Sequence, residues 1–153
     1  MQLGRYKLLA LLATGGMAEI HLARQTGIRG FERLVVVKRI LPHLARDEGF
    51  LEMFFDEARI AAQLSHPNIV QIHDLGQEGD DYYIAMEYLE GESLSHLERE
   101  ARKKRKTLPE NLAAGIMAQT CDGLDYAHGF QGPGGEPLHI VHRDVSPANI
   151  FVT

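Results

Sequence analysis

The sequence has a single cysteine and no apolar run long enough to cross a membrane. With only Cys121, the chain has no internal disulfide framework and no cysteine-based zinc site, which is typical of a reducing compartment. The apolar run from Leu8 to Ala13 has six residues, fewer than the core of a signal peptide needs. We therefore expect a cytoplasmic chain with no export signal and no membrane-spanning segment.

The sequence also has no excess of positive charge. Its 153 residues carry a formal net charge of −5 at pH 7, with 24% charged and 44% hydrophobic residues. A net negative charge argues against general binding to nucleic acids or anionic membranes. The composition is ordinary for a globular protein, and the length suits one compact domain.

The first half of the sequence is rich in strand signals. Runs of apolar and β-branched residues, separated by glycine or proline turns, predict five strands at residues 5–13, 18–24, 33–40, 70–75 and 82–88. From Gly49 to Leu64, apolar side chains recur every three or four residues, which predicts one amphipathic helix ended by Pro67. These signals predict an α+β arrangement, with a five-stranded antiparallel sheet and one main helix.

The second half has helical signals. Ser93 is suited to cap a helix that begins at Leu94. Pro109 lies where a longer helix begins, and apolar residues follow it at mostly four-residue spacing. A loop rich in glycine, residues 132–135, precedes the segment with the most informative chemistry.

That segment is residues 142–149, with the sequence His-Arg-Asp-Val-Ser-Pro-Ala-Asn. It fits the pattern H-R-D-x-x-x-x-N and so resembles the catalytic loop of protein kinases. In that family the aspartate accepts the proton of the substrate hydroxyl and the asparagine holds a metal ion. The resemblance implies that Asp144 is the catalytic base and Asn149 a Mg²⁺ ligand.

Two earlier features resemble further parts of the same family. The turn containing Gly15 and Gly16 resembles the glycine-rich loop over ATP phosphates, although Ala13 and Ala18 replace the outer glycines of the family pattern. Lys38 ends an apolar strand, where a lysine needs a counter-charge. It resembles the lysine of Val-Ala-Ile-Lys, which holds phosphates and pairs with a helix glutamate. Glu57 is the implied partner, and both residues are assigned to the catalytic set with Asp144 and Asn149.

The resemblance also implies an ATP site. Met86 and Glu87 resemble the start of the hinge between kinase lobes, where the backbone of Glu87 and Leu89 binds adenine. The implied nucleotide-binding residues are Leu12, Ala13, Thr14, Gly15, Gly16, Met17, Ala18, Ile20, Val36, Lys38, Met86, Glu87, Leu89 and Phe151.

The resemblance covers essentially all 153 residues and is to bacterial eukaryotic-like serine/threonine protein kinases. It implies an N-terminal lobe at residues 1–86, a hinge at 87–91 and the first part of a helical lobe at 92–153. The implied activity is the transfer of a phosphoryl group from ATP, with Mg²⁺, to serine or threonine hydroxyls of a protein substrate.

Two departures keep other functions open. Ser146 stands where serine/threonine kinases usually have a lysine that neutralises the transferring phosphate, although Pro147 still favours that class over tyrosine kinases. No Asp-Phe-Gly motif occurs before Thr153, so we expect the chain by itself to be inactive. The alternatives are an inactive pseudokinase-like module that binds ATP or a partner, and a small-molecule phosphotransferase of the aminoglycoside-kinase type. Arg143 and the segment 66–70 favour the protein kinases.

Overall fold

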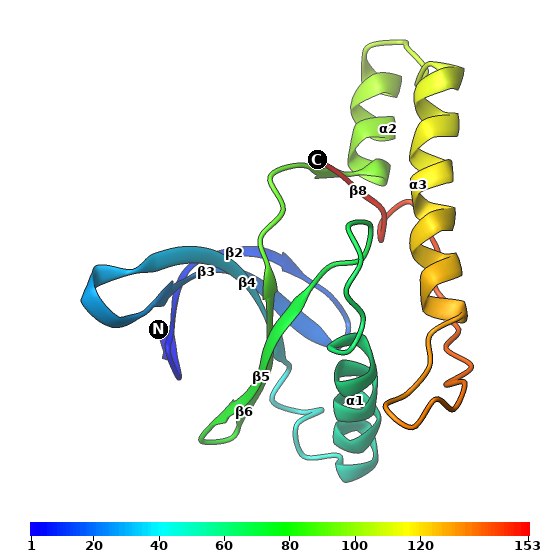
Figure 1. The fold of residues 1–153 in the computed structure, drawn as a ribbon. Coiled ribbons are helices and arrows are strands. Elements are labelled where there is room, and N and C mark those ends of the chain that lie inside the picture. Colours follow the sequence, from blue (N-terminus) through cyan, green and yellow to red (C-terminus); the bar gives the residue numbers. More distant parts are fainter. The chain divides into compact units, whose positions relative to one another are not determined.

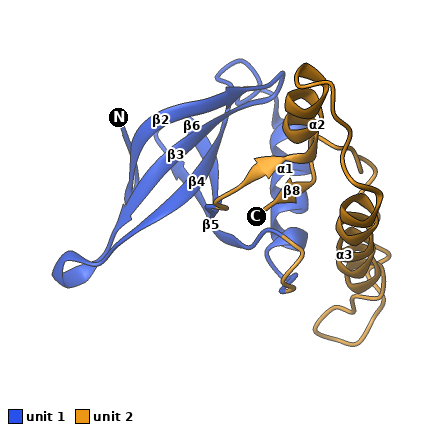
Figure 2. Ribbon diagram, turned by 90° about the horizontal axis from the view of Figure 1, so that it is seen from above, with its two compact units in different colours: residues 1–65, 70–88 blue, residues 66–69, 89–153 orange.

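The computed structural model describes all 153 residues and divides into two compact units. The first comprises Met1–Ser65 and Val70–Tyr88, and the second comprises His66–Ile69 and Leu89–Thr153, as coloured in Figure 2. The chain therefore changes unit at Ser65–His66, at Ile69–Val70 and at Tyr88–Leu89. The sequence did not predict that His66–Ile69 belongs to the second unit. No helix is long and apolar enough to span a membrane.

The first unit is built on one antiparallel sheet in the order β1-β2-β3-β4-β6-β5 (Figure 1). Its strands are β1 (Gln2–Leu3), β2 (Tyr6–Thr14), β3 (Ala18–Thr26), β4 (Glu32–Ile40), β5 (Ile72–Glu78) and β6 (Asp81–Glu87). A single 3₁₀ turn, η1 (Ile28–Gly30), joins β3 to β4. The five predicted strands are all present. The sixth, β1, is too short for a sequence signal, and it pairs with β2 because Gly4 reverses the chain with a φ of 53°.

One helix, α1 (Glu48–Ala61), belongs to this unit. The side chain of Asp47 accepts a hydrogen bond from the Phe50 N–H at 3.1 Å and so caps the first turn. The helix ends earlier than the prediction, which placed its end at Pro67. After Ala61, Gln63 and Leu64 donate to carbonyls only three residues back, so the chain leaves the helix as a tighter turn.

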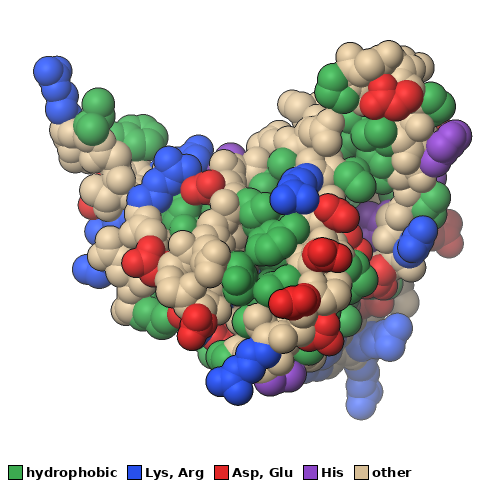
Figure 3. Space-filling model, turned by 90° about the horizontal axis from the view of Figure 1, so that it is seen from below, with side chains coloured by type: hydrophobic (Ala, Val, Ile, Leu, Met, Phe, Trp, Pro, Cys, Tyr) green, Lys and Arg blue, Asp and Glu red, His purple; other side chains and the backbone are tan.

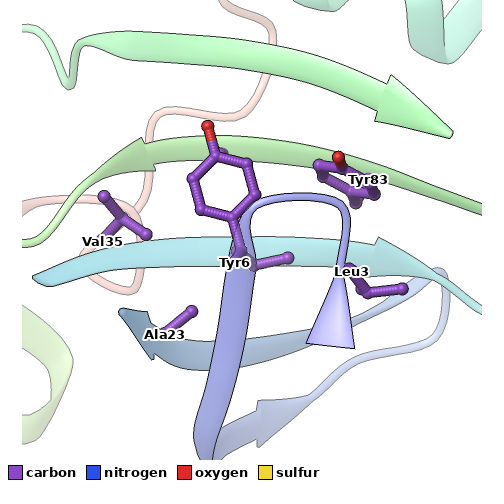
Figure 4. Packing of buried hydrophobic residues seen from close by; sticks show 7 residues of the cluster. Leu3, Tyr6, Ala23, Val35 and Tyr83 are labelled. Carbon is purple, nitrogen blue, oxygen red and sulfur yellow. The ribbon is translucent and has the colours of Figure 1, made fainter. Parts of the chain in front are cut away.

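The sheet buries apolar side chains on both faces. One cluster consists of Leu3, Tyr6, Ala23, Val35, Val37, Tyr83 and Ala85, most of which are seen in Figure 4. Tyr6 and Tyr83 meet edge to face, with ring centroids 5.8 Å apart. The hydroxyl of Tyr6 donates to the Asp74 carboxylate at 2.9 Å, so its polar end is satisfied although the residue is fully buried. On the opposite face, Phe54 and Ala58 of α1 pack against Ile40 and Ile84.

Gly76 on β5 lies against the ring of Tyr83. A Cβ at Gly76 would overlap this ring, with Cε2 only 2.9 Å away, and Tyr83 is 4% exposed and held by Tyr6. We expect Gly76→Ala to lower the free energy of unfolding by about 2–3 kcal/mol through overpacking. The control is Gly49→Ala in the first turn of α1, where the added Cβ has only ordinary contacts. This change should raise the free energy of unfolding by about 0.5–1 kcal/mol. Urea unfolding measures both, and a neutral Gly76→Ala would contradict this packing.

His73 lies where the pairing of β5 with β6 shifts register between Ile72 and Asp74. Burial lowers the pKa of His73 below 6.5, the Arg33 guanidinium lowers it further, and the Glu87 carboxylate opposes both. The His73 imidazole therefore binds a proton more readily in the unfolded chain than in the folded one. His73 favours folding above its unfolded pKa, and it destabilises the fold as the pH falls below that pKa.

We therefore expect the thermal midpoint to fall between about pH 7 and about pH 5.5, and His73→Gln to reduce that fall. The same change at the exposed His43 is the control. If His73→Gln kept the full pH dependence, another group would be responsible for it.

The second unit contains α2 (Leu94–Lys103), α3 (Glu110–His128) and a short pair of strands, β7 (Glu92–Ser93) and β8 (Phe151–Val152). The predicted cap is confirmed, since the Ser93 hydroxyl accepts from the His96 N–H at 3.3 Å. The segment His66–Ile69 packs on α3. The His66 ring stacks on Tyr126 with centroids 5.0 Å apart, and Asn68 donates to Gln119 at 3.3 Å.

The surface carries charges of both signs. On the face in Figure 3, acidic and basic side chains lie among apolar ones. The surface of the protein has several exposed ion pairs, such as Arg59 with Asp56 at 3.1 Å and Lys103 with Glu100 at 2.7 Å. Exposed pairs of this kind each contribute about 1 kcal/mol or less, so the two apolar clusters stabilise the first unit far more than its surface charges do.

Candidate functional site

In the first unit, five of the predicted nucleotide-binding residues share one face of the sheet. Ile20 pairs with Lys38 across β3 and β4, and Ala13 pairs with Ile20 across β2 and β3. Two residues further along β4, Val36 pairs with Met86. Side chains at alternate positions of paired strands point to the same face, so these five residues form one surface. It is mainly apolar and has the Lys38 ammonium at one end, which suits a flat apolar base joined to phosphates.

The turn between β2 and β3 is stabilised by hydrogen bonds to two backbone carbonyls of its second half, those of Met17 and Ala18. The Gly15 N–H donates to the Ala18 carbonyl at 2.9 Å and closes the turn, and the Leu41 N–H donates to the Met17 carbonyl at 3.1 Å. A Cβ at Gly16 would meet nothing within 4 Å. Gly16 therefore leaves open space at the tip of this turn, and contact of the turn with ATP phosphates stays a prediction.

A charge network that the sequence analysis missed lies on the opposite face of the same strands. Arg39 donates to one Asp81 oxygen at 2.9 and 2.7 Å and to Glu19 at 3.4 Å. His21 lies 3.1 Å from the same Glu19 carboxylate. Glu19 follows the glycine turn directly, so the network ties the start of β3 to β4 and to the β5–β6 turn. The only sequence feature that indicates this network is Arg39, a charged residue next to Lys38 in an apolar strand.

Lys38 and Glu57 do not form an ion pair in this structure. The Lys38 Nζ lies 5.8 Å from the centre of the Phe54 ring, and Glu57 is exposed. Residues three apart on a helix differ by roughly 60° in direction, so turning Phe54 toward the sheet leaves Glu57 at the flank of α1. A rotation of about that size would bring Glu57 toward Lys38. Their pairing stays a prediction.

The second unit brings Asp144 and Asn149 together. The Asn149 side-chain amide donates to the Asp144 carboxylate at 2.8 Å and to the Asp144 carbonyl at 3.0 Å. The Asn149 N–H also donates to the Ser146 carbonyl at 2.9 Å, and the Asp144 N–H donates to His142 Nδ1 at 3.3 Å. The predicted base and the predicted metal ligand are thus direct neighbours in a closed loop, and both are exposed.

The donor atoms of this loop suit Mg²⁺. A carboxylate and an amide oxygen are hard ligands, and Mg²⁺ usually takes only one or two protein ligands together with water and phosphate oxygens. No group of three or more histidine, cysteine, aspartate or glutamate residues forms a self-sufficient metal site. The Asn149 amide oxygen therefore fits a metal ion that arrives with a nucleotide, with the Asp144 carboxylate beside it.

The remaining predicted contacts differ in their surroundings. Glu87 is tied to Gln71, because its N–H donates to the Gln71 carbonyl at 3.0 Å and its carboxylate accepts from the Gln71 N–H at 2.6 Å. Leu12, Met17 and Phe151 have 51%, 59% and 48% of their surface exposed. Single exposed apolar side chains are common on protein surfaces, so their contact with a nucleotide stays a prediction.

Comparisons with known proteins agree on one family. A family model described as the protein kinase domain matches residues 6–153. The chain is 51% identical over 150 residues to the tyrosine-protein kinase MasK of Myxococcus xanthus, covering 98% of this chain and 23% of that protein. It is 39% identical to the serine/threonine-protein kinase PrkC of Bacillus subtilis, covering 97% of this chain and 21% of PrkC. The crystal structure of the Mycobacterium tuberculosis PknI kinase domain matches the whole chain and 56% of its own length, with 29% identity and a TM-score of 0.77.

The chain therefore belongs to the protein kinase domain family. Its α+β fold is that of the N-terminal sheet and the first helices of a kinase domain. It spans 21–23% of the curated relatives named above and 56% of the solved kinase domain.

Proposed function

We propose that the protein containing this chain transfers the γ-phosphoryl group of ATP to a hydroxyl group of a protein substrate in the cytoplasm. The observation that carries this proposal is the Asp144–Asn149 pair, with the amide 2.8 Å from the carboxylate in an H-R-D-x-x-x-x-N loop. A carboxylate acceptor fixed beside an oxygen ligand is what phosphoryl transfer from a metal nucleotide requires.

Each of these side chains then has a defined role. Asp144 accepts the proton of the attacking hydroxyl, and Asn149 holds Mg²⁺ and orients Asp144. Lys38 binds the α- and β-phosphates, while Ala13, Ile20, Val36 and Met86 cover the adenine. Bound Mg²⁺ supplies positive charge that offsets the charge developing on the phosphates.

The acceptor that we propose is serine or threonine. Pro147 follows the usual serine/threonine pattern, and PrkC bears that name. Tyrosine is the second candidate because MasK is named a tyrosine kinase, and because Ser146 departs from the serine/threonine pattern in this loop. In either case Asp144 would accept the proton of the attacking hydroxyl.

Phosphoamino-acid analysis tests this proposal. The protein at its natural length is incubated with Mg²⁺, γ-labelled ATP and a mixed protein substrate, with Asp144→Asn as the blank. We expect label on serine and threonine. Label on tyrosine alone would shift the assignment to the second candidate. Label on an added aminoglycoside and on no protein would favour a small-molecule phosphotransferase, and no label anywhere would favour a non-catalytic binding module.

A further inference from the structure

The first turn of α2 is hydrogen-bonded to the backbone that follows Asp144. The Leu94 N–H donates to the Ile150 carbonyl at 2.8 Å, and the Ser95 N–H donates to the Pro147 carbonyl at 2.9 Å. The first N–H groups of a helix have no partner within it, so they are free to bind here. Asn149 lies between the two residues whose carbonyls are held.

The preceding residues extend the same attachment. β7 pairs with β8 so that Glu92 lies opposite Val152 and Ser93 lies opposite Phe151. Residues 92–95 are thereby joined to Pro147 and to residues 150–152, on either side of Asn149. The chain that leads into α2 thus supports the catalytic loop on one side through backbone hydrogen bonds.

Gly91 permits this close approach. A Cβ at Gly91 would overlap the Val152 carbonyl oxygen and lie 2.9 Å from both the Val152 carbonyl carbon and the Thr153 Cα. All three are backbone atoms, so no side-chain rotation relieves the overlap. The φ of Gly91 is not positive, so the requirement is for space and not for a left-handed conformation.

We propose that Gly91 is a positioning residue for the catalytic loop, which acts through β8 and the first turn of α2 on Asn149 and hence on Asp144. A side chain at position 91 displaces Val152 and moves the strand that begins two residues after Asn149. The Asn149 amide then loses its position beside the Asp144 carboxylate. This inference rests on the proposed function, in which Asn149 holds Mg²⁺.

The test compares nucleotide binding with and without Mg²⁺ in the natural-length protein. Calorimetry with ADP gives the affinity in each condition, and the ratio of the two reports the Mg²⁺ site. We expect Gly91→Ala to reduce that ratio at least tenfold and to lower kcat at least tenfold. The affinity for ADP without Mg²⁺ should change less than twofold, because Lys38 and the sheet face supply it. A variant that is merely less stable lowers the active fraction and leaves the ratio unchanged.

Gly115→Ala on α3 is the matched control, since its Cβ would meet nothing within 4 Å. It should leave the ratio and kcat unchanged. If Gly91→Ala fails to fold, Leu94→Pro replaces it. Proline is tolerated at the first helical position, and Leu94→Pro removes both the N–H that binds Ile150 and the buried leucine side chain. Leu94→Ala is its control, because it removes most of the side chain and keeps the N–H.

We expect the ratio to fall in Leu94→Pro and to persist in Leu94→Ala. An unchanged ratio in Gly91→Ala, or in Leu94→Pro where Gly91→Ala does not fold, would overturn the positioning role. A wild-type protein that transfers no phosphoryl group would instead overturn the proposed function.

Discussion

Asp144→Asn is expected to lower kcat for phosphoryl transfer by roughly 10²–10⁴-fold, the range that a positioned general base contributes. Asparagine has the same shape and keeps an oxygen that accepts from Asn149, but it cannot take up the hydroxyl proton. ATP affinity should change little, because the base acts on the acceptor and not on the nucleotide. Steady-state kinetics and ATP binding on the natural-length protein measure the two effects separately.

The matched control is Asp122→Asn, which removes an exposed carboxylate from α3 in the same unit. It should leave both kcat and ATP affinity unchanged. Normal turnover in Asp144→Asn would mean that another group accepts the proton.

The second large effect is expected for Lys38→Met. Loss of the cation that binds the α- and β-phosphates should reduce kcat/KM by roughly 10²–10³-fold, as for other groups aimed at developing charge. The thermal midpoint should not fall, because Lys38 lies on an apolar strand against the Phe54 ring and has no carboxylate within ion-pair distance.

A fall in rate without a fall in thermal midpoint is thus the expected signature of Lys38→Met. Lys7→Met, on β2 and exposed, removes the same charge from the same sheet and should change neither quantity. If Lys38→Met destabilised the fold as much as it slowed the reaction, Lys38 would be a structural residue.

The sequence predicted those parts of the fold whose causes are local. The β-branched run before Lys38 predicted β4, the recurrence from Gly49 predicted α1, and Ser93 predicted the start of α2, because each depends on residues a few positions apart. The pair Asp144–Asn149 was within reach for the same reason, since one short loop contains both residues.

Contacts between distant segments were not predicted. The Arg39–Asp81–Glu19 network depends on the register of three strands, and the approach of Gly91 to Val152 depends on how two segments far apart in the sequence come together. Neither produces a periodicity or a motif. The orientation of Glu57 was also not predictable from the sequence. The spacing of apolar residues in α1 does not decide whether the side of the helix with Phe54 or the side with Glu57 faces Lys38.

A crystal structure of the natural-length protein with Mg²⁺ and a non-hydrolysable ATP analogue tests the proposed nucleotide site. We expect adenine against the face formed by Ala13, Val36 and Met86, with Lys38 Nζ hydrogen-bonded to a phosphate oxygen and the Asn149 amide oxygen on the metal. The Lys38 ammonium should then have left the Phe54 ring, with Glu57 turned toward it. A nucleotide bound elsewhere, with Lys38 still over Phe54 and Asn149 away from the metal, would show that these residues do not form the ATP site.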